Sequence, residues 1–217
     1  MLISRSIGMI MPSIYFRAFT SPATVIRTLA DHPQAANLGI RFMLIPIIAY
    51  TMMYVFLVIG NGAQSVFTPW LNIPKEDYYW WNRFLLAPSM LLAWAAVSVF
   101  IHFLARSADK KISFDSTFAA IGLSISVAMW GGLIHDLPMS FFSATGVIDA
   151  RQHEIDMNSP TIWRTLLWIA YSIYLLAFLF YFSLSVRVVH GRSWLLSIVT
   201  GLCGFILFQL IFLVFNR

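Results

Sequence analysis

Charged side chains are scarce in this sequence. Its 217 residues include 14 Lys and Arg and nine Asp and Glu, so only 11% are charged, while 59% are hydrophobic. Soluble domains are typically about 25% charged. A soluble fold of this length needs a polar surface that so few charged residues do not supply. The composition therefore excludes an ordinary soluble domain and predicts an integral membrane protein, whose first partner is the lipid bilayer.

Cysteine is nearly absent as well, because Cys203 is the single copy and lies in an apolar run. No disulfide can form within the chain, so cysteine usage does not define the redox compartment. Phosphate-binding loops, Gly-rich dinucleotide turns, GxSxG elbows and CxxCH haem sites are also missing. The net charge of +5 comes from basic residues dispersed at the ends of apolar runs. We therefore expect no cofactor, no nucleic-acid partner and no enzymatic activity.

Five apolar segments are long enough to cross a bilayer, which takes about 20 residues for about 30 Å of hydrocarbon. Backbone groups in lipid must be hydrogen-bonded within their own segment, so these segments are expected to be helices. The sequence thus predicts an all-α, polytopic membrane helix bundle, with an amphipathic arm over residues 1–41 and a membrane domain over residues 42–217. The five predicted transmembrane helices cover residues 42–59, 84–105, 118–134, 166–186 and 194–215.

The distribution of Lys and Arg predicts how the chain is oriented, because cytoplasmic loops carry an excess of both residues. Five of them fall on one side of the predicted membrane: Lys75, Arg83, Arg151, Arg164 and Arg217. The other side holds nine: Arg5, Arg17, Arg27, Arg41, Arg106, Lys110, Lys111, Arg187 and Arg192. The amino terminus is therefore predicted to be cytoplasmic and the carboxyl terminus outside.

A short amphipathic helix is predicted within the arm. Ser21 and Pro22 are typical of a helix start, and the proline after His32 favours a helix end. Apolar residues between them share one face, and Arg residues lie beside it. Such a segment is expected to lie in the headgroup plane. Packing against the cytoplasmic ends of the spans is the alternative, and a partner-binding arm is compatible with either placement.

The third span carries a stripe of small residues. Ser116, Ala120, Ser124, Ala128 and Gly132 recur every four residues and so share one face. Small residues allow helices to approach closely in a membrane. The stripe predicts that the third span is the central packing helix, with a pore-lining face as the alternative.

The polar stretch ARSADKKISFDSTF joins the second and third spans and supplies several candidate binding residues. Arg106, Lys110 and Lys111 are expected to hold this turn on the cytoplasmic side, and Asp115 is expected to cap the following helix. His102 precedes Arg106 by one helical turn and is the ionisable residue well inside a span. An intramembrane ionisable group is a functional candidate by default.

A second group of candidates lies on the predicted outer side. His135 and Asp136 are expected to close the third span, and a loop from 136 to 163 follows with Asp149, His153, Glu154 and Asp156. Imidazole and carboxylate together can bind a divalent cation. The HEID sequence at 153–156, however, lacks the second histidine of the zinc-protease motif. We therefore interpret the segment as a solvated loop and predict no metal site.

The order of these features resembles a known family, the Yip (Ypt-interacting protein) domain. The segment SPATVIRTLADHPQAANLGIRF at 21–42 is similar to the arm of its bacterial members, and HFLARSADKKISFDSTFAAIG at 102–122 stands where they have a polar turn and a Ser-Phe step. One difference is at 128–130, where family members often have a proline and this chain has Ala-Met-Trp. The resemblance spans residues 22–215.

The resemblance implies five spans, a cytoplasmic amino terminus and a non-enzymatic membrane protein. Eukaryotic members associate with prenylated Rab GTPases and act in vesicle traffic. They carry a long polar amino-terminal tail that this chain does not have, so the resemblance favours the bacterial branch. It implies a location in the bacterial cytoplasmic (inner) membrane, with a eukaryotic endomembrane as the alternative.

Three functional hypotheses follow from the sequence. The leading one is a binding, scaffold or membrane-organisation factor that contacts a protein partner through the arm and the 105–118 turn. The second is a small transporter, channel or lipid-moving protein that uses a polar path near His102 and the third span. The third is a metal-dependent membrane enzyme, which needs His135, His153 and a carboxylate around one ion. The ligand, the identity of a partner and the oligomeric state are not predicted.

Overall fold

The computed structural model describes residues 13–63, 73–106 and 111–216, and all regular structure within these ranges is helical. Residues 13–20 are helical and precede α2. The remaining elements are α2 (Pro22–Ala30), α3 (Ala35–Ile59), a short 3₁₀ helix η1 (Lys75–Asp77), α4 (Tyr78–Leu104), α5 (Phe114–Ala128), α6 (Trp130–Ala144), α7 (Ala150–Asn158), α8 (Ile162–His190) and α9 (Trp194–Asn216). The fold is therefore an all-α bundle, as the sequence predicts.

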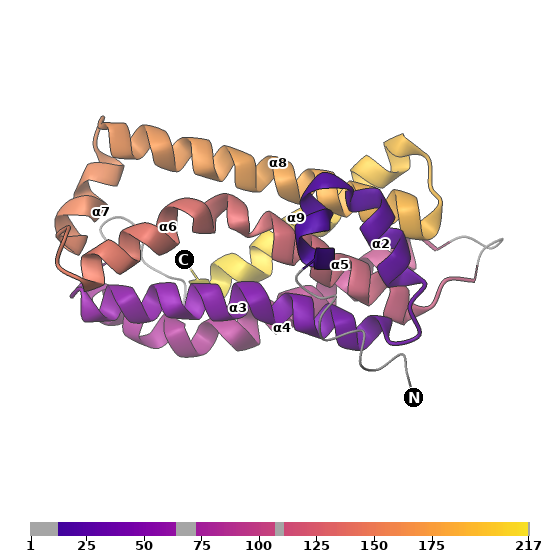
Figure 1. Ribbon diagram of the computed structural model, residues 1–217, viewed down its shortest axis with the longest axis horizontal. Coiled ribbons are helices and arrows are strands. Elements are labelled where there is room, and N and C mark those ends of the chain that lie inside the picture. The colour runs from indigo at the N-terminus through magenta and orange to yellow at the C-terminus, as the bar shows by residue number, and fades with distance from the viewer. Residues whose placement is uncertain (1–12, 64–72, 107–110, 217) are drawn as a thin grey trace.

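Four of the helices are each long and apolar enough to cross a membrane. They are α3, α4, α8 and α9, with 25, 27, 29 and 23 residues. Helices α5 and α6 meet the same length and hydropathy criteria as a pair, bent by 46° at the break between them, so the candidate spans number five if this pair counts as one crossing. Figure 1 shows this pair running along the bundle from the end that carries α2 to the end that carries α7. We call these the α2 end and the α7 end.

The third predicted span differs most from the structure. The sequence predicts one helix over 118–134, whereas α5 begins at Phe114, the helix breaks at Met129, and α6 continues to Ala144. His135 and Asp136 therefore lie within α6 and do not close the span. The break is followed by Gly131 and Gly132, and glycine is a common site of helix kinks. The segment predicted as a loop after residue 136 is instead largely helical, because it holds the rest of α6 and the whole of α7.

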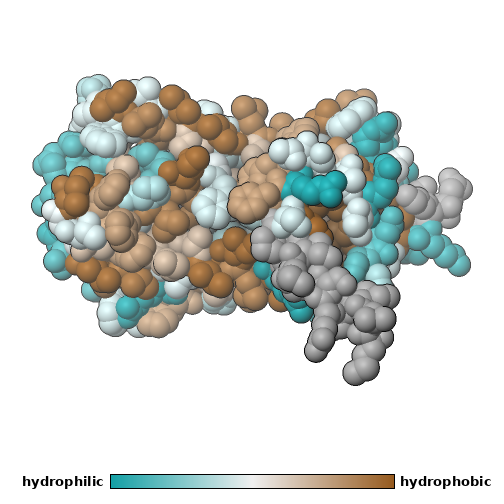
Figure 2. All heavy atoms as spheres, viewed as in Figure 1, coloured by the Kyte–Doolittle hydropathy of each residue, from teal (hydrophilic) through white to brown (hydrophobic). Residues whose placement is uncertain are grey.

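Hydropathy along the surface fits a membrane-spanning bundle. In Figure 2, hydrophilic residues gather at the two ends of the long axis, and mostly hydrophobic or intermediate residues cover the middle of this face. Large apolar side chains such as Leu176 (67% exposed) and Leu195 (76% exposed) point outward. In lipid such exposure has no hydrophobic cost, because the acyl chains are as apolar as the side chains.

The centre of the bundle is α5. Its residues from Ala119 to Ala128 are all buried, and it contacts α3, α4 and α8. On the predicted small-residue stripe, the hydroxyl of Ser124 lies 2.8 Å from the hydroxyl of Ser185 on α8. Nearby on the same helix, the hydroxyl of Ser126 donates to the carbonyl of Phe42 at 2.7 Å. The Ser124 contact supports the packing interpretation of the stripe, since this serine binds a neighbouring helix.

The described part of the arm, residues 13–41, packs on the bundle, which is the second of the two placements considered from the sequence; residues 1–12 lie outside the described residues. Helix α2 starts with proline at its first turn and buries Val25, Ile26 and Leu29, and it contacts α5 and α8. The carbonyl of its last residue, Ala30, accepts a hydrogen bond of 2.6 Å from Ser116 Oγ at the start of α5. The arm thereby covers the α2 end of the central helix.

Tyr15, in the helical segment before α2, forms hydrogen bonds with residues on both sides of the break between α5 and α6. Its hydroxyl lies 3.1 Å from the carbonyl of Ser126 as a donor, and it accepts a hydrogen bond of 2.7 Å from the indole N–H of Trp130. In an unbroken helix the Ser126 carbonyl would accept from the amide of residue 130. Backbone groups freed by a break in lipid need another partner, and the arm supplies one here.

Candidate functional site

The predicted site residues fall at opposite ends of the bundle. His102, Arg106, Lys111 and Asp115 lie at the α2 end, and His135 and Asp136 lie in the half towards the α7 end. Lys110 lies outside the described residues. The residues predicted from the sequence therefore form two separate groups in the fold, and the contacts of each group are described in turn.

His102 takes part in a hydrogen-bonded chain between three helices. Its Nδ1 lies 3.1 Å from the hydroxyl of Thr117 on α5, which lies 3.1 Å from Nε2 of His190 on α8. The two imidazole rings are 6.0 Å apart. This arrangement joins α4, α5 and α8, so the residue has a structural role in packing. It gives no support to a polar path at this position.

The turn after α4 is closed by a guanidinium group. Arg192, just before α9, donates from Nε to the carbonyl of Ala105 at 2.9 Å and from Nη2 to the carbonyl of Arg106. The side chains of Arg106, Lys111 and Asp115 are exposed. Asp115 does not cap α5 as predicted, because the hydroxyl of Ser113 accepts from the amide of residue 116. Asp115 instead sits in the first turn, where a carboxylate is favoured by the helix dipole.

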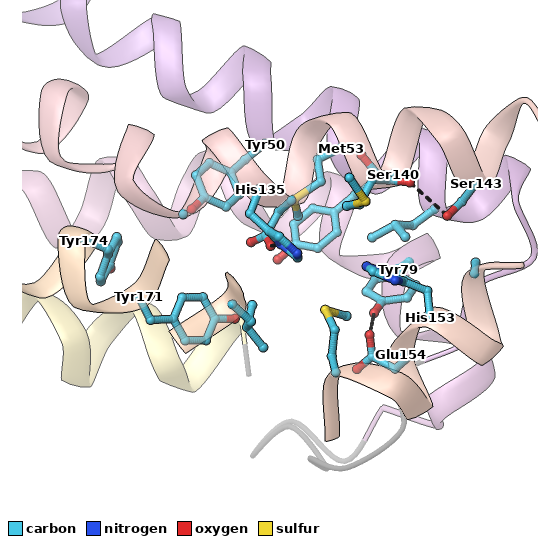
Figure 3. A pocket seen from close by; sticks show the side chains of 18 of the residues that line it. Tyr50, Met53, Tyr79, His135, Ser140, Ser143, His153, Glu154, Tyr171 and Tyr174 are labelled. Carbon is cyan, nitrogen blue, oxygen red and sulfur yellow. Dashed lines mark hydrogen bonds and ion pairs between the residues drawn. The ribbon is translucent and has the colours of Figure 1, made fainter. Parts of the chain in front are cut away.

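A cavity of about 360 Å³ lies in the half of the bundle towards the α7 end, between α3, the start of α4, α6, α7, α8 and α9. This volume is within the usual range for small-molecule sites, roughly 300–1,000 Å³. The lining includes six tyrosines: Tyr50, Tyr54, Tyr78, Tyr79, Tyr171 and Tyr174. Its ionisable residues include two histidines and two carboxylates, His135, His153, Asp136 and Glu154. Figure 3 shows His135 and His153 entering the cavity from α6 and α7.

His135 is oriented by its neighbour on α6. Its Nδ1 lies 2.8 Å from Oδ1 of Asp136, and the residue is 8% exposed. When the ring holds a single proton, the Asp136 carboxylate favours its place on Nδ1, which leaves the lone pair on Nε2. Within the described part of the chain, Nε2 is buried without a hydrogen-bond partner. A buried polar atom of this kind calls for an explanation, such as a bound molecule.

His153 is positioned by the short helix α7. The Asp149 carboxylate starts that helix by accepting from the amides of Arg151 and Gln152 at 2.8 and 2.9 Å. The imidazole of His153 is 5.9 Å from that of His135, with an angle of 23° between the rings, and the residue is 8% exposed. Its Nε2 is likewise buried and has no partner among the described residues.

Burial lowers the pKa of His153, and the neighbouring His135 lowers it further, while Asp156 and Asp136 act in the opposite direction. The ordinary pKa of histidine is about 6.5. Burial in the cavity therefore disfavours a positive charge on the His153 ring.

A metal centre was one hypothesis for His135 and His153. The described residues contain no group of three or more His, Cys, Asp or Glu side chains placed to hold one ion. The two imidazoles are stacked, with the carboxylate of Asp136 engaged by His135 Nδ1. This geometry gives the metal-dependent alternative no third ligand.

Sequence reasoning placed His153 and Glu154 in a solvated loop and so missed their part in the cavity. Both belong to α7, where Glu154 accepts a hydrogen bond from the hydroxyl of Tyr79 on α4 at 3.5 Å. A signal was present in the sequence, because a His-Asp pair at 135–136 is followed by a His-Glu pair at 153–154. Nothing in the sequence showed that the two pairs meet.

A scan against models of protein families, a search of curated proteins and a search of solved structures each gave no match to this chain.

Proposed function

We propose that this chain is a non-enzymatic, multi-pass membrane protein that binds a small, largely apolar molecule in the cavity of the α7 half. The observation that carries the proposal is the pair of buried imidazoles whose Nε2 atoms have no partner within the described residues. They lie in a cavity of about 360 Å³ whose lining is mostly aromatic and aliphatic. A few fixed polar groups in an apolar cavity are typical of ligand sites.

The position of the cavity favours binding over transport. Its lining lies in the α7 half and reaches towards the middle of the bundle at Tyr50 and Gly132. At the α2 end the His102, Thr117 and His190 side chains join three helices. By the distribution of Lys and Arg, the α7 end faces the outside, so we propose entry from the outer face or the outer leaflet. The membrane we propose is the bacterial cytoplasmic membrane, with a eukaryotic endomembrane as the alternative. Membership of the Yip domain family stays a prediction.

Cysteine labelling tests this proposal, because the chain has a single native cysteine that can be replaced by serine. In the Cys203→Ser background, Met139→Cys places a thiol in the cavity lining. Met129→Cys is the matched control, since Met129 lies on the same span and is 0% exposed. In proteoliposomes we expect N-ethylmaleimide to label the Met139→Cys thiol much faster than the Met129→Cys thiol, and octanol to slow the faster reaction. Equal labelling of the two thiols, or no protection by octanol, would contradict a ligand cavity.

Docking of a protein partner at the α2 end is a second candidate function. It is supported by exposed cations that form no ion pair within the described part of the chain: Arg17, Arg27, Arg41, Arg106 and Lys111. Free cations on one surface attract an acidic partner, and salt weakens that attraction. We expect a partner that co-purifies with the wild type to be lost after combined Arg106→Ala, Lys110→Ala and Lys111→Ala substitution. It should also be released by high salt. A partner retained by the triple variant would exclude this surface.

A further inference from the structure

The carboxylates of Asp136 and Glu154 give the lining of the cavity charges of one sign. None of the described lining residues is Lys or Arg. Two arginines near the α7 end are engaged elsewhere. Arg151 donates to the carbonyl of Asn61 at 3.0 Å, and the guanidinium of Arg83 lies 3.4 Å from the ring centre of Trp80. Because burial disfavours a positive charge on His153, the carboxylates of Asp136 and Glu154 set the electrostatic character of the cavity, which favours a cation over an anion.

Hydrogen-bonding capacity narrows the class of cation. With the Nδ1–H of His135 donating a hydrogen bond to Asp136, the buried Nε2 of His135 is an acceptor that needs a donor. The ammonium of a primary amine has three N–H donors, whereas a quaternary ammonium has none. Tyrosine rings around the same space add attraction for either cation through their π faces. The unsatisfied Nε2 acceptor of His135 is therefore the feature that favours a primary ammonium over a quaternary one.

We propose that the cavity is selective for a primary amine with an apolar body. The ammonium group donates to Nε2 of His135 and is balanced by Asp136 and Glu154, while the apolar body lies among the tyrosines and methionines of the lining. An anion would meet two carboxylates, and a neutral alcohol would satisfy the imidazole without using their charge. This inference rests on the proposed function, because it names the ligand class of the same cavity.

The test uses probes that share an eight-carbon chain and differ in the head group: octylamine, octanol, octanoate and octyltrimethylammonium. Each is assayed for protection of the Met139→Cys thiol against N-ethylmaleimide in proteoliposomes, and its concentration in the bilayer is measured separately. Hydrogen bonds to charged groups contribute more than neutral ones, and 1.4 kcal/mol corresponds to tenfold. We expect octylamine to protect at about tenfold lower membrane concentration than octanol. Octyltrimethylammonium should fall between them, and octanoate should protect least.

Variants separate this inference from the proposed function. Asp136→Asn is expected to remove most of the preference for octylamine over octanol, and Glu154→Gln part of it. Asp31→Asn is the matched control, because Asp31 follows α2 at the far end of the bundle and is exposed. Retained protection by octanol shows that the Asp136→Asn cavity is intact. Octanol and octylamine protecting equally in the wild type would overturn amine selectivity and leave ligand binding standing. Protection by none of the probes would overturn both.

Discussion

Gly131→Ala is expected to lower the free energy of unfolding by about 3 kcal/mol, near the upper end of typical overpacking costs. A Cβ at this position would lie 2.5 Å from both the Cα and the backbone nitrogen of Tyr174 on α8. Backbone atoms cannot rotate away as a side chain does, so α6 and α8 would have to separate. Gly131 directly follows the first residue of α6, so the change acts where the third span bends.

Gly132→Ala is the control for this prediction. The nearest atom to its added Cβ is the hydroxyl oxygen of Tyr50 at 3.1 Å, which is the end of a side chain. Alanine also favours the helix over glycine by about 1 kcal/mol. The net change is therefore expected to stay within about 1 kcal/mol. Unfolding of the purified variants in mixed detergent and dodecyl sulfate micelles, followed by tryptophan fluorescence, measures both. Equal stability of the two variants would show that the close contact of α6 with α8 is not required.

Trp94→Ala is expected to cost about 3–5 kcal/mol, the usual range for removal of a large buried aromatic side chain. The indole is 2% exposed and stacks on Phe118 with ring centres 3.8 Å apart. Its N–H donates to the carbonyl of Phe118 at 2.9 Å. It also fills the space that two glycines leave open, since a Cβ at Gly39 or Gly122 would lie 3.3 or 3.0 Å from its ring. One side chain thus joins α3, α4 and α5.

Two further variants test the origin of this loss in stability. Trp94→Phe separates ring packing from the indole hydrogen bond, and Trp81→Ala is the control for an exposed tryptophan. The phenylalanine variant keeps an aromatic ring in the stack but leaves the Phe118 carbonyl without its donor, so it should fall between the wild type and Trp94→Ala. Trp81 is 50% exposed on the same helix, and its removal is expected to cost less than about 1 kcal/mol, as for most surface positions. The same unfolding measurement applies to all three. A loss for Trp94→Ala no larger than for Trp81→Ala would exclude the indole as the centre of this junction.

The helical crossings could be predicted from the sequence because apolar runs alone determine which segments enter lipid. The predicted second and fourth spans begin at residues 84 and 166, whereas α4 and α8 begin at Tyr78 and Ile162. Helices continue past the hydrocarbon into the interface, where polar and aromatic residues are tolerated. Hydropathy therefore locates the middle of a span better than its ends.

The break in the third span and the cavity could not be predicted in the same way. A His-Asp pair after an apolar run has the same local signature whether it ends a span or lies inside one. In the structure it lies inside α6, because the helix runs on to Ala144. The approach of His153 to His135 depends on how α7 folds back over the bundle, and that is a tertiary contact. The prediction that Asp115 caps α5 was also wrong, because Ser113 is the capping residue in the structure.

The contact of Tyr15 with Ser126 and Trp130 has a consequence for the order of events during synthesis. These partners follow it by 111 and 115 residues in the chain. At about 5–20 residues per second, the ribosome needs roughly 5–20 s to make them. During that interval the Tyr15 hydroxyl has neither of these partners, although its ring can already stack on Phe42 of α3. Docking of this segment is therefore completed late, after α5 and the start of α6 have been made.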